Sequence, residues 1–142
     1  KRAAILVDRS SSKSRFSVYN KASKVLSKGL SVCIFPEKEY SDQTILLNPF
    51  KKGAFKLAIR HQLSICPMVF LDCKRKFPWY TTHGYPGQLR VIVHEPISTI
   101  GMTDKDINKL QEKTYNLIYD ELKNDPKQSA IEAIEICKKS KL

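Results

Sequence analysis

Long apolar runs, closely paired cysteines and acidic residues are all scarce in this sequence of 142 residues. No apolar run reaches the roughly 18 residues that a membrane-spanning helix needs, so the sequence predicts no such helix. Only five glycines are present, and the hydrophobic content of 42% is that of a folded protein, which excludes a disordered or fibrous chain. The length suits one folded unit, and we expect a single domain over residues 1–142.

The four cysteines lack the short paired spacing of zinc ribbons and of redox motifs. Cys33 and Cys66 lie inside apolar runs, where a free cysteine behaves as a small hydrophobic residue. We therefore predict buried, reduced thiols, and we expect neither a metal ion nor a cofactor.

Acidic residues number only 14 against 25 lysines and arginines, which gives a formal net charge of +11. Residues 80–142 hold nine of each sign, so the whole basic excess lies in residues 1–79. A basic surface on one side of a protein favours an anionic partner, such as phosphate groups, a nucleic acid or an anionic membrane. A lysine-rich helix face in contact with water would give the same composition.

Short apolar runs alternate with segments whose apolar residues recur at helical spacing. The predicted strands are residues 3–7, 30–35, 65–71 and 88–94, and the predicted helices are residues 14–28, 52–62, 103–123 and a last helix after Pro126. This order predicts an α/β layered fold with a mixed, mostly parallel sheet flanked by helices. We expect residues 30–35 and 65–71 to be strands buried on both faces.

Three segments carry side chains that could bind an anion. Arg9 and Glu37 each follow the end of a predicted strand, where ligands gather in parallel sheets. Lys51 and Lys52 precede Gly53 at a predicted helix start, where backbone N–H groups and the helix dipole favour phosphate. Each segment also has a structural explanation: an ion pair of Arg9 with Asp8, a carboxylate on a loop surface, and an ordinary helix start.

Four ordered blocks of this sequence resemble motifs of the glycerolipid acyltransferase family, whose members include the lysophosphatidate acyltransferases. They are Ala3-Ala4-Ile5-Leu6-Val7-Asp8-Arg9, Phe35-Pro36-Glu37-Lys38, residues 49–55 and Ile65-Cys66-Pro67-Met68-Val69. The resemblance covers residues 1–100, and residues 101–142 would add helices at the carboxy-terminal side. The chain departs from the family pattern at Ala3 and Lys38, where glycine is usual, and at residues 39–41, where Thr-Arg-Ser is usual.

The resemblance implies a fold like that of glycerol-3-phosphate acyltransferase and an enzyme of phospholipid biosynthesis. Such an enzyme moves a fatty acyl group from coenzyme A or acyl carrier protein to lysophosphatidate, at the cytoplasmic face of the cell membrane. The partners implied are a lysophospholipid, an acyl thioester, the anionic membrane surface and acyl carrier protein. In this family an arginine and the Phe-Pro-Glu loop hold the phosphoglycerol group, which carries over to Arg9 and Glu37. Because the usual loop arginine is missing, Lys38, Lys51 and Lys52 are further candidates for binding the phosphate.

The resemblance also implies a catalytic histidine that is followed five residues later by an aspartate. The three histidines here, His61, His83 and His94, are followed at that distance by Cys66, Gln88 and Thr99. We therefore expect the catalytic pair to precede Lys1, and we expect this chain by itself to be inactive. His61 and His94 are interpreted as structural or surface residues.

Two other classes of protein remain as alternatives. A basic α/β module for binding nucleic acid would use the lysines and arginines together with Phe77, Trp79 and Tyr80. A membrane-surface protein without catalysis would use residues 77–80 as an aromatic anchor beside the basic residues 74–76. The aromatic residues gather in one loop and no RNA-binding motif is present, so we favour the acyltransferase and expect no nucleic acid partner.

Overall fold

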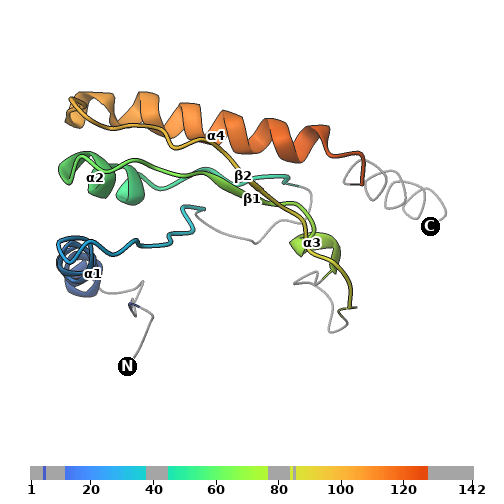
Figure 1. Ribbon diagram of the computed structural model, residues 1–142, viewed down its shortest axis with the longest axis horizontal. Coiled ribbons are helices and arrows are strands. Elements are labelled where there is room, and N and C mark those ends of the chain that lie inside the picture. Colours follow the sequence, from blue (N-terminus) through green and yellow to red (C-terminus); the bar gives the residue numbers. More distant parts are fainter. Residues whose placement is uncertain (1–4, 6–11, 38–44, 77–83, 85, 128–142) are drawn as a thin grey trace.

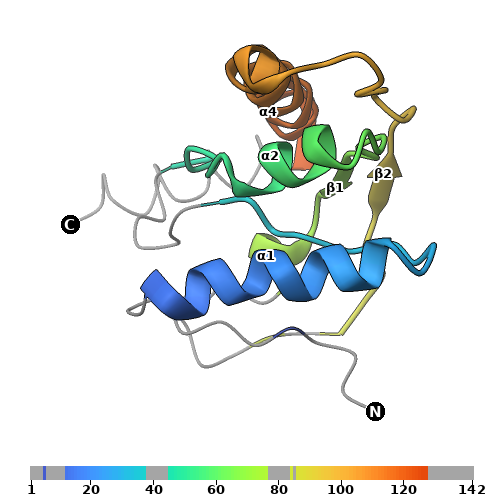
Figure 2. The same ribbon diagram turned by 90° about the vertical axis from the view of Figure 1, so that its left-hand side faces the viewer.

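The computed structural model describes residues 5, 12–37, 45–76, 84 and 86–127. Three helices form successive levels: α4 (Ile107–Asn124) lies on one side, α2 (Gly53–Arg60) lies beneath it, and α1 (Ser12–Leu26) lies below α2 (Figure 1). Turning the molecule shows α1 and α2 together on one face (Figure 2). The three predicted helices that fall in the described residues are thus confirmed, with their ends shifted by a few residues.

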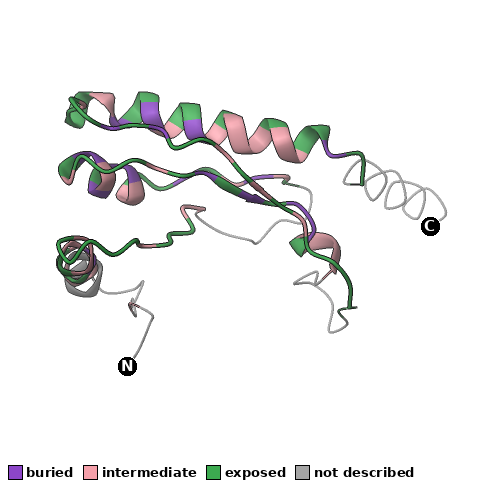
Figure 3. Cartoon of the chain, in the orientation of Figure 1, coloured by how far each residue is buried: buried purple, intermediate pink, exposed green. Residues whose placement is uncertain are grey.

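The core lies between α4 and the level that contains α2. Its buried side chains are Leu47, Phe50, Phe55, Ile59, Ile97, Ile107 and Leu110, and Figure 3 shows buried positions on the facing sides of α2 and α4. Helix α4 is preceded by a 3-10 turn, η1 (Asp104–Asp106), at which the Asp106 carboxylate accepts hydrogen bonds from the Thr103 backbone N–H and hydroxyl. These bonds lower the pKa of Asp106, and they confirm Thr103 as the start of the predicted helix.

The sheet in the described residues consists of two short antiparallel strands, β1 (Met68–Phe70) and β2 (Val91–Val93). The described part of their connection contains only the short helix α3 (Cys73–Lys76). A parallel pair needs a crossover connection, usually a longer helix that packs across the sheet. The combination of helices with a small sheet is therefore confirmed, whereas the mostly parallel layered sheet of the predicted α/β fold is not found in the described part of the chain.

The two strands are covered on one face only. Met68 pairs with Val93 and Phe70 pairs with Val91, and all four side chains are exposed by 40–59%. Val69 points to the opposite face and is buried. Alternation along a strand explains this pattern, since successive side chains point to opposite faces. The expectation that residues 65–71 are buried on both faces was wrong.

Residues 30–35 are extended but form no strand, and Leu30, Ile34 and Phe35 are exposed by 42–69%. The cysteine in this segment, Cys33, is exposed, as are Cys66 and Cys73, and all three thiols are free. The prediction of a buried strand and of buried thiols was therefore wrong here. An apolar run becomes buried only where another element covers it, and no described element pairs with residues 30–35.

Side chains of α1 contact both ends of α2. A Cβ atom added at Gly53 would lie only 2.8 Å from the Tyr19 hydroxyl oxygen, so position 53 favours glycine. The Ser23 Oγ atom and the His61 Nε2 atom are 2.9 Å apart and share a hydrogen bond. None of the helices in the described residues has the length and apolar character needed to cross a bilayer. The predicted strand at residues 3–7 and the helix after Pro126 lie outside the described residues, apart from Ile5 and Lys127.

Candidate functional site

Two of the sequence segments singled out above lie side by side. Glu37 and Phe50 form an isolated antiparallel bridge, and the Lys51 N–H donates to the Pro36 carbonyl oxygen over 2.8 Å. The Glu37 carboxylate also accepts a hydrogen bond of 3.2 Å from the Asn48 N–H. We call this pairing of residues 36–37 with residues 50–51 the Glu37 bridge. It joins the Phe-Pro-Glu segment to the segment that begins α2.

Helix α4 supports the Glu37 bridge from the core side. The Gln111 Nε2 atom donates to the Phe50 carbonyl oxygen over 2.7 Å, and the Tyr115 hydroxyl donates to the Leu47 carbonyl oxygen over 2.9 Å. The Tyr115 ring stands edge-on against the Phe50 ring, with centroids 5.1 Å apart. Burial raises the pKa of Tyr115, and the nearby Tyr119 and Glu37 raise it further, so the hydroxyl stays protonated and keeps its donor role.

Lys51 and Lys52 stand directly before the first residue of α2, and both side chains are exposed. Glu37 faces the side of the bridge that holds Phe50, because bridged residues share a face. Lys51 follows Phe50 in the sequence, so its side chain leaves the backbone on the opposite face. The glycine after the lysines has a packing role, since it makes room for Tyr19.

Of the five residues predicted to bind substrate, the structure describes Glu37, Lys51 and Lys52 and brings them to one short region. Arg9 and Lys38 lie outside the described residues. The structure also gives Glu37 a role that the sequence did not suggest, because its carboxylate holds the backbone of Asn48. The histidine interpretation is consistent with the contacts found: His61 meets Ser23, and His94 Nε2 lies 3.6 Å from Glu121 on α4.

The basic excess is concentrated around this region. Residues 12–36 and 45–71 contain nine lysines and arginines and no acid. Lys52, at the cap of α2, and Lys56 and Arg60 within it are exposed and recur every four residues, which places them along one side of the helix. Lys21 and Lys24 on α1 and Lys28 just after it are also exposed. Glu37 is therefore the one carboxylate that the structure describes between residues 12 and 71.

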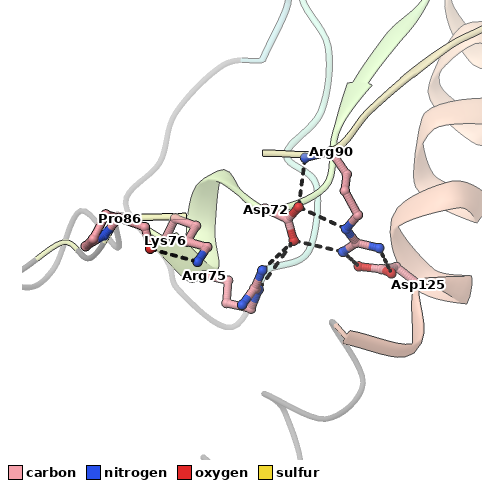
Figure 4. A network of polar contacts seen from close by, with 6 residues as sticks. All are labelled: Asp72, Arg75, Lys76, Pro86, Arg90 and Asp125. Carbon is pink, nitrogen blue, oxygen red and sulfur yellow. Dashed lines mark hydrogen bonds and ion pairs between the residues drawn. The ribbon is translucent and has the colours of Figure 1, made fainter. Parts of the chain in front are cut away.

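A second polar cluster, which the sequence analysis missed, lies at the far end of the sheet. It comprises Asp72, Arg75, Arg90 and Asp125, and we call it the arginine network (Figure 4). Arg90 donates to Asp72 from its backbone N–H, Nε and Nη2 atoms at 2.8–2.9 Å, and to both Asp125 oxygens at 2.9 Å. Arg75 adds a bond of 2.9 Å to Asp72.

The network connects the end of β1, the start of β2 and the end of α4. Asp72 is only 1% exposed, and the hydrogen bonds from Arg90 hold the pKa of its carboxyl well below the usual range. The same bonds raise the pKa of Arg90, and Arg90 lowers that of Asp125. With its carboxylates ionised and paired, the network joins elements of the fold. One sequence signal could have revealed it: Asp72 directly follows a buried apolar run, and an acid there needs a partner.

Comparison with known proteins adds independent information on this chain. The model of the acyltransferase family matches residues 2–71, the part that contains both sides of the Glu37 bridge. An uncharacterized acyltransferase of Schizosaccharomyces pombe is 33% identical over 113 residues, which is 78% of this chain and 40% of that protein. The human 1-acyl-sn-glycerol-3-phosphate acyltransferase beta is 39% identical over 93 residues, 61% of this chain and 31% of that protein.

A solved structure shares the fold. The crystal structure of the 1-acyl-sn-glycerophosphate acyltransferase of Thermotoga maritima matches with a TM-score of 0.62 and 22% identity, over 75% of this chain and 44% of that one. The chain thus spans less than half the length of the relatives and of the structure described here.

Proposed function

Because this chain belongs to the glycerolipid acyltransferase family, we propose that the protein containing it transfers a fatty acyl group to lysophosphatidate. The human and mouse relatives are named 1-acyl-sn-glycerol-3-phosphate acyltransferases, and that name supports the choice of acceptor. The acyl donor in this proposal is a thioester of coenzyme A or of acyl carrier protein. The product is phosphatidate, an intermediate of phospholipid synthesis.

The observation that carries the proposal is the Glu37 bridge. Two sequence blocks typical of this family, separated by about a dozen residues, are held together by a bond of 2.8 Å between Lys51 and Pro36. Next to this contact lie two exposed lysines and the start of α2, and residues 45–71 contain no acid. A phosphate group fits this combination of cations and helix N–H groups.

We assign the phosphoglycerol group of the acceptor to Arg9, Glu37, Lys38, Lys51 and Lys52. In this assignment the lysines bind the phosphate, and Glu37 orients the segment and accepts from a glycerol hydroxyl. The proton of the attacking hydroxyl would be removed by a histidine paired with an aspartate. Since none of the three histidines in this sequence is followed five residues later by an aspartate, this chain alone would bind the acceptor without acylating it.

The proposal places the protein at the cytoplasmic face of a membrane. The exposed basic residues of α1 and α2 support an anionic lipid surface as the partner, since each lysine or arginine near such a surface adds about 1 kcal/mol of attraction. The substrate phosphate and the lipid headgroups would then be attracted by the same side of the molecule.

A binding measurement tests the acceptor site on this chain. Titration of the labelled 142-residue protein with glycerol 3-phosphate should shift amide signals around residues 48–53. Replacing both lysines, Lys51→Gln with Lys52→Gln, should weaken binding about tenfold or more, because two charge-assisted contacts are lost. The matched control replaces Lys109 and Lys113 on α4 with glutamine, which changes net charge equally and should leave the affinity within about twofold. Equal effects of both double variants would contradict the site.

An acyl-transfer assay tests the activity. The longest product of the gene is incubated with lysophosphatidate and either acyl-coenzyme A or acyl carrier protein loaded with an acyl chain. We expect phosphatidate from one donor, and a strong loss of turnover in the Arg9→Ala variant. Absence of product with both donors would contradict the proposed acceptor. Salt-sensitive binding of oligonucleotides of any sequence, without phosphatidate formation, would favour the nucleic-acid alternative.

A further inference from the structure

We propose that Gln111 and Tyr115 are positioning residues, which hold the backbone of residues 47–51 in one fixed arrangement and so present Lys51 and Lys52 to the substrate phosphate. This inference rests on the proposed function for its substrate, and on the contacts of α4 for its geometry. Both residues lie outside residues 2–71, the part of the chain that the family model matches.

The two side chains reach the same short segment from successive turns of α4. Their Nε2 and hydroxyl groups donate to the carbonyl oxygens of Phe50 and Leu47, at 2.7 and 2.9 Å. The four-residue spacing of Gln111 and Tyr115 places both on one side of the helix. The segment is thereby fixed at both ends, with Pro49 between the two bonded carbonyls.

These bonds bear directly on Glu37. Between Leu47 and Phe50 stands Asn48, whose N–H donates to the Glu37 carboxylate over 3.2 Å. Directly after Phe50 comes Lys51, whose N–H donates to Pro36. A shift of residues 47–50 would therefore move Asn48 and Phe50, which contact Glu37. It would also move the backbone from which the Lys51 side chain extends.

The surface beside this contact is concave in the described part of the chain. An open pocket of about 420 Å³ is lined by Pro49, Phe50, Asn108, Gln111, Glu112 and Tyr115. Residues 47–50 are held against α4 by the two hydrogen bonds, by the edge-on contact of the Phe50 and Tyr115 rings, and by the packing of Leu47 and Phe50 in the core. Removing a hydrogen bond here should loosen the segment without opening the core.

Tyr115→Phe is the variant that tests this inference, since it keeps the ring and removes only the hydroxyl. Gln111→Met removes the second donor at nearly constant size and keeps helix propensity. The matched control is Tyr119→Phe, the same change one turn along α4, on a ring that stacks against Tyr115 with centroids 5.9 Å apart. In each protein, hydrogen exchange is measured at the amides of Asn48 and Lys51, and at Ile65 and Ile97, which bond each other elsewhere in the core.

We expect exchange at Asn48 and Lys51 to rise about fivefold to tenfold in Tyr115→Phe and in Gln111→Met, as the loss of one hydrogen bond predicts. Exchange at Ile65 and Ile97 should stay within about twofold, and Tyr119→Phe should change neither pair. The dissociation constant for glycerol 3-phosphate should rise about threefold or more in the two test variants.

Each outcome decides the inference. Equal acceleration at all four amides would show a general loss of stability and would overturn it, as would unchanged exchange at Asn48 and Lys51. Local acceleration with unchanged affinity for glycerol 3-phosphate would show a contact without a role in binding, which also overturns it. Failure of the unmodified protein to bind glycerol 3-phosphate would contradict the proposed function instead, and the exchange data would still decide whether α4 holds this segment.

Discussion

Arg90 binds Asp72 in a bidentate manner: its Nε and Nη2 atoms donate to the two oxygens of one carboxylate, at 2.9 and 2.8 Å. The same guanidinium also reaches both oxygens of Asp125 at the end of α4. One side chain therefore satisfies two carboxylates that the fold buries, and it joins three elements that are distant in sequence. Planar recognition of this kind is specific to arginine.

Replacing Arg90 with methionine should destabilise the protein strongly, because Asp72 would remain buried and, among the described residues, would keep Arg75 alone as a charged partner. We expect the Tm to fall by about 10 °C or more. Arg75→Met is the matched control, since it removes one partner of Asp72 and leaves all the bonds of Arg90; its Tm should fall by only a few degrees. Thermal unfolding followed by circular dichroism makes the comparison. Equal losses in both variants would show that Arg90 has no special role.

The arginine network also predicts how stability depends on pH. The folded-state pKa of Asp72 lies well below its usual range, so the network contributes stability that is complete above the unfolded-state pKa of about 4. That contribution is lost as the pH falls further, through the folded-state value. The urea midpoint of the unmodified protein should therefore exceed that of Arg90→Met. This difference should be constant from pH 7 to about 5 and should shrink below about pH 4. A margin that grew on acidification would contradict the assignment.

The core between α2 and α4 should be sensitive to loss of volume. Leu110 is 2% exposed and belongs to the main apolar cluster. Leu110→Ala should reduce the free energy of unfolding by about 2–5 kcal/mol, since it removes buried methyl groups and leaves a cavity. Ile100, which is 78% exposed, provides the control, and Ile100→Ala should change this free energy by less than about 0.5 kcal/mol. Denaturant titration of both variants measures these two changes in the free energy of unfolding.

Gly53 should tolerate a side chain only when Tyr19 is shortened. A Cβ atom at Gly53 would lie 2.8 Å from the Tyr19 hydroxyl oxygen but 3.7 Å from the ring carbon that carries it. Gly53→Ala alone should therefore gain little or lose stability, whereas Gly53→Ala in a Tyr19→Phe background should gain about 0.5–1 kcal/mol from the greater helix propensity of alanine. A double-mutant cycle measures this difference. Additive effects of the two changes would show that the close contact does not constrain residue 53.

The helices could be predicted because their signals are local. The apolar spacing of α1, α2 and α4 and the cap at Thr103 depend on residues close together in sequence, and the structure confirms them. The sheet could not be predicted in the same way, since an apolar run carries no information about which distant element packs against it. Residues 30–35 and 65–71 read alike in sequence, yet only the second contains a paired strand. The direction of pairing depends on distant residues, and the mostly parallel sheet stays a prediction outside the described part of the chain.

The candidate site was partly predictable for the same reason. Lys51, Lys52 and Glu37 stand out from their positions beside strand and helix ends, and the structure brings their segments together. The contribution of Gln111 and Tyr115 could not be read from the sequence, because they act on Phe50 and Leu47 across a separation of more than 60 residues. Arg90 likewise lies within the predicted strand at residues 88–94, and its two carboxylate partners are evident only in three dimensions.

The open face of the β1–β2 pair affects the thermodynamics of unfolding. Met68, Phe70, Val91 and Val93 are already partly in contact with water in the folded chain, so unfolding newly exposes only the remainder of each side chain. The heat-capacity change and the denaturant m-value both scale with newly exposed surface. These four side chains should therefore contribute less to both quantities than fully buried side chains of the same size would.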